Sequence, residues 1–150
     1  MYVRFDKLYY SYLFGNWEGA GGSIYIESSN SLVMDAYEKF LGKYVDVSAN
    51  LKLNTYFYYT IIGVLDGNVL KLYIDGELIG TSTISTLKLS YASVYIGANN
   101  NTAALDDGFA AISLKEAMLY DRAISADEVT TFTKMFEHKY KSISKYIQYK

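Results

Sequence analysis

The stretch 70–80 most constrains the fold, because it predicts two antiparallel strands joined by a very short turn. Alternate residues from Leu70 to Ile74 are apolar, which is the pattern of a strand with one buried face. Asp75-Gly76 follows, and this pair favours a two-residue hairpin because both turn positions need a positive φ. A second turn at 66–68 precedes this hairpin. The segment from about 56 to 83 therefore predicts three consecutive antiparallel strands.

Short strands are also predicted on both sides of this segment. The alternation of apolar and polar residues indicates strands at 2–14 (one or two), 23–27, 32–37, 43–48, 56–65, 84–90, 92–96 and 110–121. The 17 Tyr and 7 Phe favour strands. Because the chain has no Pro, we expect Gly, Asn and Asp to form the turns. Few helical patterns alternate with these strands, which argues against a parallel sheet. We therefore expect an all-β fold, an antiparallel two-sheet sandwich, with a closed barrel as the alternative.

One helix is predicted near the end of the chain. Ser125-Ala126-Asp127-Glu128 is a capping box, in which Ser125 and Glu128 each bond the other's backbone N–H. Apolar residues then recur at helical spacing, and this stripe is expected to pack on the sheet: Val129, Phe132, Met135, Phe136 and Tyr140. The length of 150 residues suits one domain, 1–150, with the helix and tail at about 126–150.

Composition excludes several classes of protein. Hydrophobic residues make up 51% and charged residues 20%, so the chain is not of the disordered type. A net charge of -2 gives no attraction to nucleic acid or to anionic membranes. The absence of Cys excludes disulfides and thiolate zinc sites. No apolar run approaches the roughly 20 residues of a membrane span, and no signal peptide is visible.

Several motifs resemble those of the laminin-G-like, concanavalin A-like lectin/glucanase jelly rolls. The resemblance covers about 53–129, and upstream it is limited to 12–17. The matching motifs are Thr-Ile-Ile-Gly-Val-Leu-Asp-Gly at 60–67, Leu-Lys-Leu-Tyr-Ile-Asp-Gly at 70–76, Val-Tyr-Ile-Gly at 94–97 and Leu-Tyr-Asp-Arg-Ala-Ile-Ser at 119–125. This resemblance implies a jelly-roll sandwich and a binding module that recognises glycan or another surface ligand through loops at one rim.

The chain departs from the family pattern in three places. Where the family usually has Trp at the start of the central strand, this chain has Tyr56 and Tyr58. Lys115-Glu116 supplies one carboxylate, and no Gly is present, where the family often has Gly and several acidic residues. The family's first strands are missing before Met1. This last departure predicts an edge of the sandwich that is uncovered, or that another segment or chain completes.

Catalysis is not expected. Glucanases on this fold place acidic residues at alternate positions of one strand, so that two carboxyl groups flank the scissile bond. Glu27 and Asp35 stand alone on their predicted strands. The single His, His138, lies on the predicted helix with no partner set around it. We therefore predict a non-enzymatic protein with no catalytic residues.

Candidate ligand residues lie mainly in the polar loops. Trp17 and Tyr58 offer rings that stack on a sugar, and the loop of Asn99, Asn100 and Asn101 offers amide groups. Asp106 and Asp107, with that loop, are candidate oxygen ligands for calcium, the one cofactor for which the sequence offers ligands. The alternative reading makes Trp17 a half-buried aromatic and the Asn and Asp loops solvated turns.

A second functional hypothesis belongs to a different class. The uncovered edge, the many Tyr and the apolar tail also suit a structural or assembly protein of a virion or surface particle, capsid- or tail-associated in a phage. Both hypotheses place the protein outside the cell or on a particle surface. The predicted partners are a glycan or a protein surface, with an oligomer or larger assembly formed through the open sheet edge.

Overall fold

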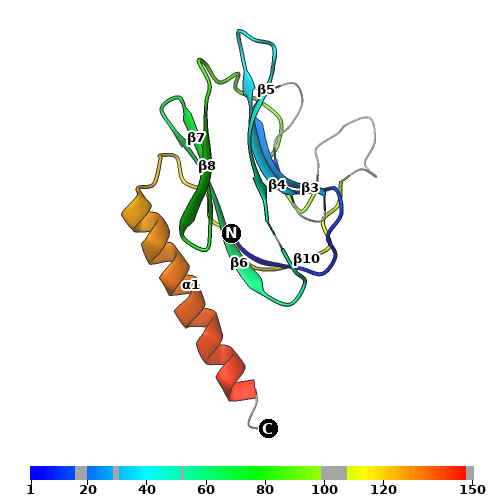
Figure 1. The fold of residues 1–150 in the computed structure, drawn as a ribbon, viewed down its shortest axis with the longest axis vertical. Helices are drawn as coiled ribbons and strands as arrows, with labels where there is room; N and C mark the ends of the chain where they lie inside the picture. Colours follow the sequence, from blue (N-terminus) through cyan, green and yellow to red (C-terminus); the bar gives the residue numbers. More distant parts are fainter. Residues whose placement is uncertain (16–19, 29–30, 52, 99–107, 148–150) are drawn as a thin grey trace.

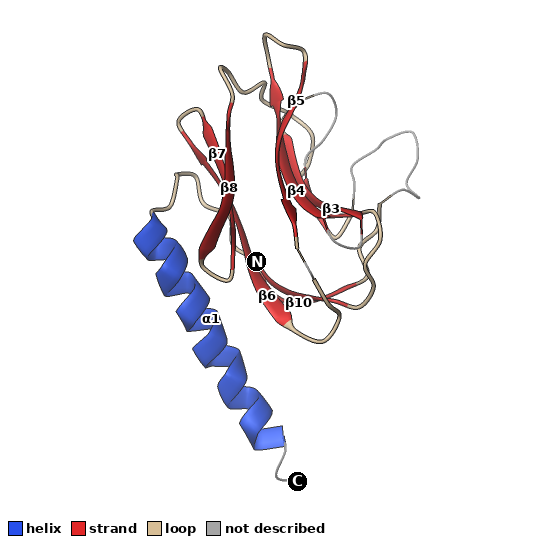
Figure 2. Cartoon of the chain, in the orientation of Figure 1, coloured by secondary structure: helices blue, strands red, loops and turns tan. Residues whose placement is uncertain are grey.

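A computed structural model describes residues 1–15, 20–28, 31–51, 53–98 and 108–147 of the chain. These residues form two five-stranded antiparallel sheets that face each other, and one helix (Figures 1 and 2). In spatial order, the first sheet contains β10 (Ile112–Glu116), β1 (Tyr2–Phe5), β6 (Tyr58–Asp66), β7 (Val69–Ile74) and β8 (Glu77–Thr83). The second contains β5 (Lys43–Asn50), β4 (Ser31–Glu38), β3 (Gly22–Ser28), β2 (Ser11–Gly15) and β9 (Tyr95–Ile96). The predicted two-sheet sandwich is therefore confirmed, and the barrel is excluded.

The predicted hairpin joins β7 to β8. Its two turn residues both have positive φ, 50° at Asp75 and 85° at Gly76, as the Asp-Gly pair predicts. The turn at 66–68 joins β6 to β7, and Leu72 pairs with both Gly63 and Gly80 across the ladders. These three strands are neighbours in the first sheet, in chain order.

The core lies between the two sheets. Each strand sends every second side chain inward, so apolar residues from both sheets meet there. The fully buried members include Val3, Phe5, Leu13, Ile26, Leu32, Ile61, Leu70 and Leu72. The edge strands β5 and β8 contact each other and close one side of the sandwich.

The helix α1 (Ala126–Ile147) begins at the predicted capping box. The Ser125 N–H donates to Glu128 Oε2 at 2.8 Å, and the Glu128 N–H donates to Ser125 Oγ at 3.2 Å. The helix packs on the outer face of the first sheet, where Val129 joins Val64 and Tyr73, and its C-terminal end projects beyond the sheets (Figure 1). The predicted apolar stripe is correct except at Met135, which is 39% exposed. Among the described residues, no helix is long and apolar enough to span a membrane.

The strand predicted at 110–121 ends early. Only residues 112–116 of it pair with β1, and the last pair joins Glu116 to Tyr2. Because β1 begins there, the residues that follow Glu116 have no neighbouring strand, and 117–124 runs to the helix as irregular chain. The strand predicted at 92–96 is likewise reduced to the two residues of β9.

The stretch 84–90 forms no strand and is held by a buried carboxylate instead. Glu38, at the end of β4, accepts the N–H groups of Ser85 and Thr86 at 2.6 and 2.9 Å. It also accepts the Ser85 hydroxyl at 2.7 Å and the Phe40 N–H at 2.8 Å. Hydrogen bonds from a side chain thus hold this stretch in place of the strand pairing that was predicted. One isolated β-bridge, between Glu38 and Leu87, is present.

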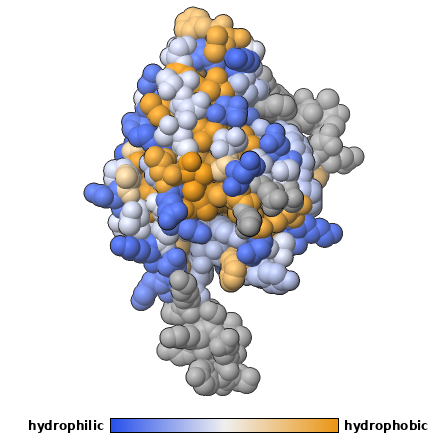
Figure 3. All heavy atoms as spheres, viewed as in Figure 1, coloured by the Kyte–Doolittle hydropathy of each residue, from blue (hydrophilic) through white to orange (hydrophobic). Residues whose placement is uncertain are grey.

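Apolar groups are not confined to the interior. Figure 3 shows hydrophobic atoms gathered in the middle of one face of the molecule, with hydrophilic atoms around them. The turn between β4 and β5, at the top of this view, carries Phe40 and Leu41, which are 75% and 63% exposed. Such surfaces are candidates for contact with other molecules.

Candidate functional site on the second sheet

The polar side chains of the second sheet form rows across neighbouring strands. On β3, β4 and β5, the residues that alternate with the core positions face away from the first sheet. Register places Ser23 beside Asp35 and Asp35 beside Asp46. A parallel row joins Tyr37 to Tyr44. We call this surface, together with Tyr10, Tyr12 and Tyr25, the outer face.

Three tyrosines gather at the β2 end of the outer face. The rings of Tyr12 and Tyr25 lie 5.3 Å apart, and Tyr10 stands edge-on to Tyr12 at 5.6 Å. The hydroxyl oxygens of Tyr10 and Tyr12 are 2.7 Å apart and share a hydrogen bond. Tyr12 is only 3% exposed, whereas Tyr10 is 50% exposed. Tyr12 therefore supports the cluster, and Tyr10 and the half-buried Tyr25 present ring surface to a ligand.

A hydrogen-bonded carboxylate lies at the centre of the outer face. Asp35 Oδ1 accepts both the backbone N–H of Ser23 at 2.9 Å and the Ser23 hydroxyl at 2.7 Å. Burial raises the pKa of Asp35 to about 6, with the negative charge of Asp46 contributing and the Ser23 bonds opposing. Asp46, its cross-strand neighbour, is exposed. Asp46 therefore offers exposed acceptors of the kind that bind sugar hydroxyls, and Asp35 lies buried beside it.

A second aromatic pair lies on the far side of these carboxylates. The rings of Tyr37 and Tyr44 meet edge to face with centroids 4.9 Å apart. Lys88 Nζ lies 5.0 Å from the Tyr37 ring centroid, in position for a cation–π contact. Both tyrosines are half-buried. Along its strands, the outer face thus presents an aromatic row, then an acidic row, then a second aromatic row.

The electrostatic character of the outer face is acidic. Burial raises the pKa of Tyr25, and the negative charges of Asp35, Glu27 and Asp46 raise it further. Three carboxylates therefore act on one tyrosine hydroxyl. This arrangement favours a ligand that donates hydrogen bonds and carries no negative charge.

Tyr58 lies on the first sheet, away from the outer face. Its ring stacks on Tyr2 at 5.2 Å, and Arg4 and Lys115 lie 5.5 and 5.6 Å from its centroid. Tyr2 in turn stacks on Phe136 of the helix. The ring therefore helps to dock the helix, and a ligand-binding role for Tyr58 stays a prediction.

The other residues predicted from sequence fall outside the part of the chain that the structure describes. They are Trp17, Asn99, Asn100, Asn101, Asp106 and Asp107. Within the described part, no group of three or more His, Asp or Glu residues is placed to hold a metal ion. Calcium binding therefore also stays a prediction.

The central residues of the outer face are not apparent from the sequence. Glu27 and Asp35 stood alone when each strand was considered by itself, but register brings Asp46 of the next strand beside Asp35. The sequence does show that Tyr and Asp alternate with the apolar core residues in three strands, which places them on the outward side. Only the pairing of β4 with β5 shows that these positions are neighbours.

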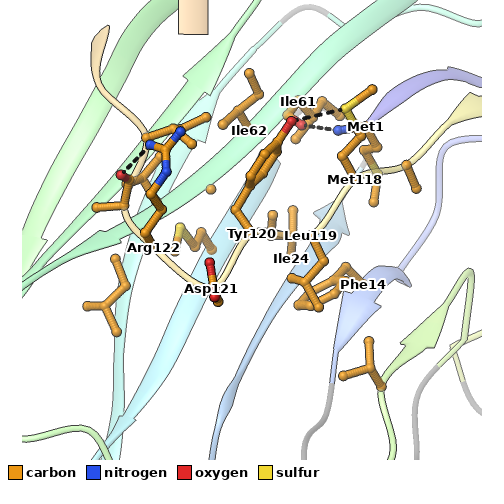
Figure 4. A pocket seen from close by; sticks show the side chains of 18 of the residues that line it. Met1, Phe14, Ile24, Ile61, Ile62, Met118, Leu119, Tyr120, Asp121 and Arg122 are labelled. Carbon is orange, nitrogen blue, oxygen red and sulfur yellow. Dashed lines mark hydrogen bonds between the residues drawn. The ribbon is translucent and has the colours of Figure 1, made fainter. Parts of the chain in front are cut away.

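An apolar cavity lies elsewhere in the molecule and has a different chemistry. It has a volume of about 750 Å³ and opens beside β6 and the segment 117–124 (Figure 4). Its walls are mostly apolar, and Figure 4 shows Tyr120 across it, with Met1 and Ile61 at one end and Arg122 at the other. Arg122 is bound to Glu128, with Nη1–Oε2 2.9 Å and Nη2–Oε1 2.5 Å. Few polar groups are left to orient a sugar there.

The family model that matches the chain describes the concanavalin A-like lectin/glucanases superfamily and covers residues 1–130. The chain belongs to this superfamily. The match begins at Met1, so it includes the N-terminal strands, where the motif resemblance was limited to 12–17. A comparison with curated protein sequences found no match.

Solved structures with the same fold include binding domains of toxins and of a sialidase. The binding domain of Paraclostridial Mosquitocidal Protein 1 is 19% identical, with a TM-score of 0.69 over 90% of this chain and 36% of that one. The CBM40 domain of Ruminococcus gnavus IT-sialidase, bound to α2,3 sialyllactose, is 16% identical, with a TM-score of 0.67 over 88% and 79%. The botulinum neurotoxin serotype D binding domain is 11% identical, with a TM-score of 0.60 over 89% of this chain and 35% of that one. The chain spans about a third of the toxin structures, and at these identities the likeness establishes the fold.

Proposed function

We propose that this chain is a non-catalytic module that binds a neutral glycan on the outer face of the second sheet. The observation that carries the proposal is that rows of tyrosine rings lie on both sides of a row of carboxylates on the strands β2 to β5. Aromatic faces stack on the apolar side of a sugar ring, and carboxylates accept bonds from its hydroxyls. The structural likeness to a carbohydrate-binding CBM40 domain supports the proposal.

The charge of the outer face argues for a neutral sugar rather than a sialylated one. The CBM40 domain is bound to α2,3 sialyllactose, which carries a carboxylate. In this chain the negative charges of Glu27, Asp35 and Asp46 all act on Tyr25, so the carboxylate of a sialylated ligand would be repelled. We therefore place sialyllactose among the ligands that bind weakly or not at all.

The test is calorimetric titration of neutral oligosaccharides and of α2,3 sialyllactose, each with and without calcium. We expect a neutral oligosaccharide to bind, and Tyr25→Ala or Asp46→Asn to weaken its binding by about tenfold. Tyr56→Ala is the matched control, since Tyr56 is 83% exposed and lies before β6 on the other sheet. Its binding is expected to match that of the wild type.

Two outcomes contradict the proposal. One is a folded wild-type protein that binds none of the neutral sugars, or that binds sialyllactose best. The other is hydrolysis of the bound oligosaccharide by the wild type but not by Asp46→Asn. That result would show that Asp35 and Asp46 act as a catalytic pair.

The loop candidates Trp17, Asn99, Asn100 and Asn101 are tested by alanine substitution in the same titration.

The assembly role is the second candidate. It is favoured by one edge of β6, where β1 pairs only with Tyr58–Thr60 although β6 extends to Asp66. A structural protein of a virion or surface particle forms a defined complex with another component. Sedimentation of the chain alone and with its neighbouring gene products distinguishes the two functions. A protein that stays monomeric in every mixture argues against assembly.

A further inference from the structure

The edge of β6 is only partly covered. On that side β1 pairs with Tyr58–Thr60, and Met1 adds the last two bonds. The Met1 nitrogen donates to the Ile61 carbonyl at 2.7 Å, and the Ile61 N–H donates to the Met1 carbonyl at 2.9 Å. β6 continues to Asp66, so the edge from 62 to 66 extends past the end of β1. No described residue pairs with that edge.

The backbone groups that face this edge follow from the register. In an antiparallel sheet, successive residues direct their N–H and C=O groups to opposite neighbours. Ile61 faces β1, so Ile62 and Val64 face β7 and pair with Tyr73 and Lys71. Gly63 and Leu65 therefore face the bare edge. Their two N–H donors and two C=O acceptors have no partner among the described residues, and they are spaced as a pairing strand requires.

A second segment borders the same gap. In the sheet order β10 lies beside β1, and its last pair joins Glu116 to Tyr2. Both β1 and β10 thus stop at one level, while β6 continues on one side and 117–122 on the other. Between them lies the apolar cavity of about 750 Å³ (Figure 4). The gap follows the line of β1, which is one strand position in the sheet.

The walls of the gap are apolar on both faces. Phe14, Ile24 and Met34 line it on the side of the second sheet. Phe132 and Phe136 of the helix line it on the opposite side. A strand in this position would be covered on both faces, as are the central strands of buried sheets.

We propose that this gap, the β6 slot, binds an extended apolar strand from a partner polypeptide. The strand runs antiparallel to β6 and in line with β1, opposite residues 62–66. Its alternate backbone groups bond Gly63 and Leu65, and its side chains fill both apolar walls. The facing donors and acceptors favour a peptide over a lipid chain, which leaves them unsatisfied. The β6 slot is separate from the outer face, so this proposal does not depend on glycan binding.

The test uses an acetylated, amidated peptide Lys-Val-Ile-Val, which matches the slot when its last Val lies opposite Gly63 and its C-terminal amide stops short of the Met1 nitrogen. The control peptide Lys-Val-Ile-Pro lacks the N–H at that position. We expect the first peptide to slow hydrogen exchange at the Gly63 and Leu65 amides by about tenfold or more and to raise Tm by a few degrees. The proline peptide is expected to do neither.

Two variants locate the binding. Leu119 lines the gap and is 73% exposed, so Leu119→Lys places a charge there without disturbing the core. Its affinity for the peptide is expected to fall about tenfold. Leu41→Lys, at the exposed β4–β5 turn, is the matched control and is expected to bind as the wild type does.

A third variant carries Lys-Val-Ile-Val-Val directly in front of Met1, in which the last Val joins the peptide sequence to the chain. A rise in Tm with this extension, together with binding of the free peptide, supports the proposal. Stabilisation by the extension without binding of the free peptide at millimolar concentration overturns it, because the slot then takes only a covalently attached segment. Protection by lauric acid but not by the peptide, or self-association that the peptide does not reverse, also overturns it.

Discussion

Two buried carboxylates show how local donors decide the charge of a residue in this fold. Asp35 is 6% exposed and receives both of its hydrogen bonds from one residue, Ser23, while Asp46 repels it. Burial dominates, and the pKa of Asp35 is raised to about 6. Glu38 has no exposed surface but accepts four bonds from Thr86, Ser85 and Phe40, which lower its pKa to about 2. The number of donors, rather than burial alone, separates the two.

Asp35→Asn is expected to change how stability depends on pH. The pKa of Asp35 rises from 3.8 to about 6 on folding, so the folded state holds its proton more tightly. The stability of the wild type therefore falls as pH rises from about 4 to 6. Asn keeps an oxygen for both Ser23 bonds and has no charge. Relative to the wild type, the variant is expected to gain about 2 to 3 kcal/mol between pH 3.5 and 7.

Urea denaturation of both proteins at pH 3.5, 5 and 7 measures this difference. An equal stability difference at all three pH values would show that Asp35 ionises as freely in the folded chain as in the unfolded one.

Glu38→Gln is expected to lower Tm by about 5 to 10 °C at pH 7, because an amide nitrogen replaces one acceptor oxygen facing several donors. The lowered pKa of Glu38 means that its contribution is full above the ordinary value of 4.5 and is lost as pH falls toward about 2. The difference in Tm between the wild type and Glu38→Gln should therefore become smaller as the pH falls. Thermal unfolding from pH 3 to 7 measures it, with Glu77→Gln, an exposed residue, as the control. Equal Tm values for the Glu38 and Glu77 variants would contradict this role.

At the scale of elements, the β7–β8 hairpin joins a local turn to the helix. Gly76 has φ 85°, a conformation that costs other residues because Cβ crowds the backbone. A Cβ there would also lie 3.4 Å from Thr133 Oγ1 of the helix. The Asp-Gly turn therefore both reverses the chain and leaves room for α1.

Gly76→Ala is expected to destabilise the protein by about 1–2 kcal/mol. Gly67→Ala is the matched control, since Gly67 has φ 61° but no atom within 4 Å of the added Cβ. The Gly76 change should be the more costly of the two, because it adds the contact with Thr133 to the backbone strain. Urea unfolding measures both, and a larger loss at Gly67 would contradict the contact with the helix.

At the scale of the whole molecule, the sandwich is closed on one side and open on the other. The strands β5 and β8 contact at the closed side, whereas the apolar cavity beside β6 marks the open side. The helix covers the side of the first sheet that is turned away from the second sheet. Val129 and Phe136 are buried there, and Phe136 stacks on Tyr2 of β1. The helix therefore helps to hold β1 in place.

Phe136→Ala is expected to cost about 3 kcal/mol, because it removes a ring that is only 3% exposed. Met135→Ala, on the same helical turn at 39% exposure, is expected to change stability by less than about 0.5 kcal/mol. Denaturant unfolding followed by circular dichroism and by tyrosine fluorescence gives both values. Similar losses in the two variants would show that the helix does not pack as described.

Features that depend on neighbouring residues could be predicted from the sequence alone. Alternation from Leu70 to Ile74 predicted a strand, Asp75-Gly76 predicted its turn, and Ser125 with Glu128 predicted the start of the helix. Each rests on backbone geometry or on a bond within a few residues. For the same reason the motifs were sufficient to indicate the fold family.

Features that depend on register between distant segments emerged only from the folded chain. The pairing of β4 with β5 brings Asp46 beside Asp35, and no spacing within one strand reveals it. The pairing of Tyr2 with Glu116 decides where β10 ends, although the alternation continues past it in the sequence. A strand persists only where a neighbour satisfies its backbone groups, and that neighbour comes from the other end of the chain. The outer face and the β6 slot both arise from such pairings.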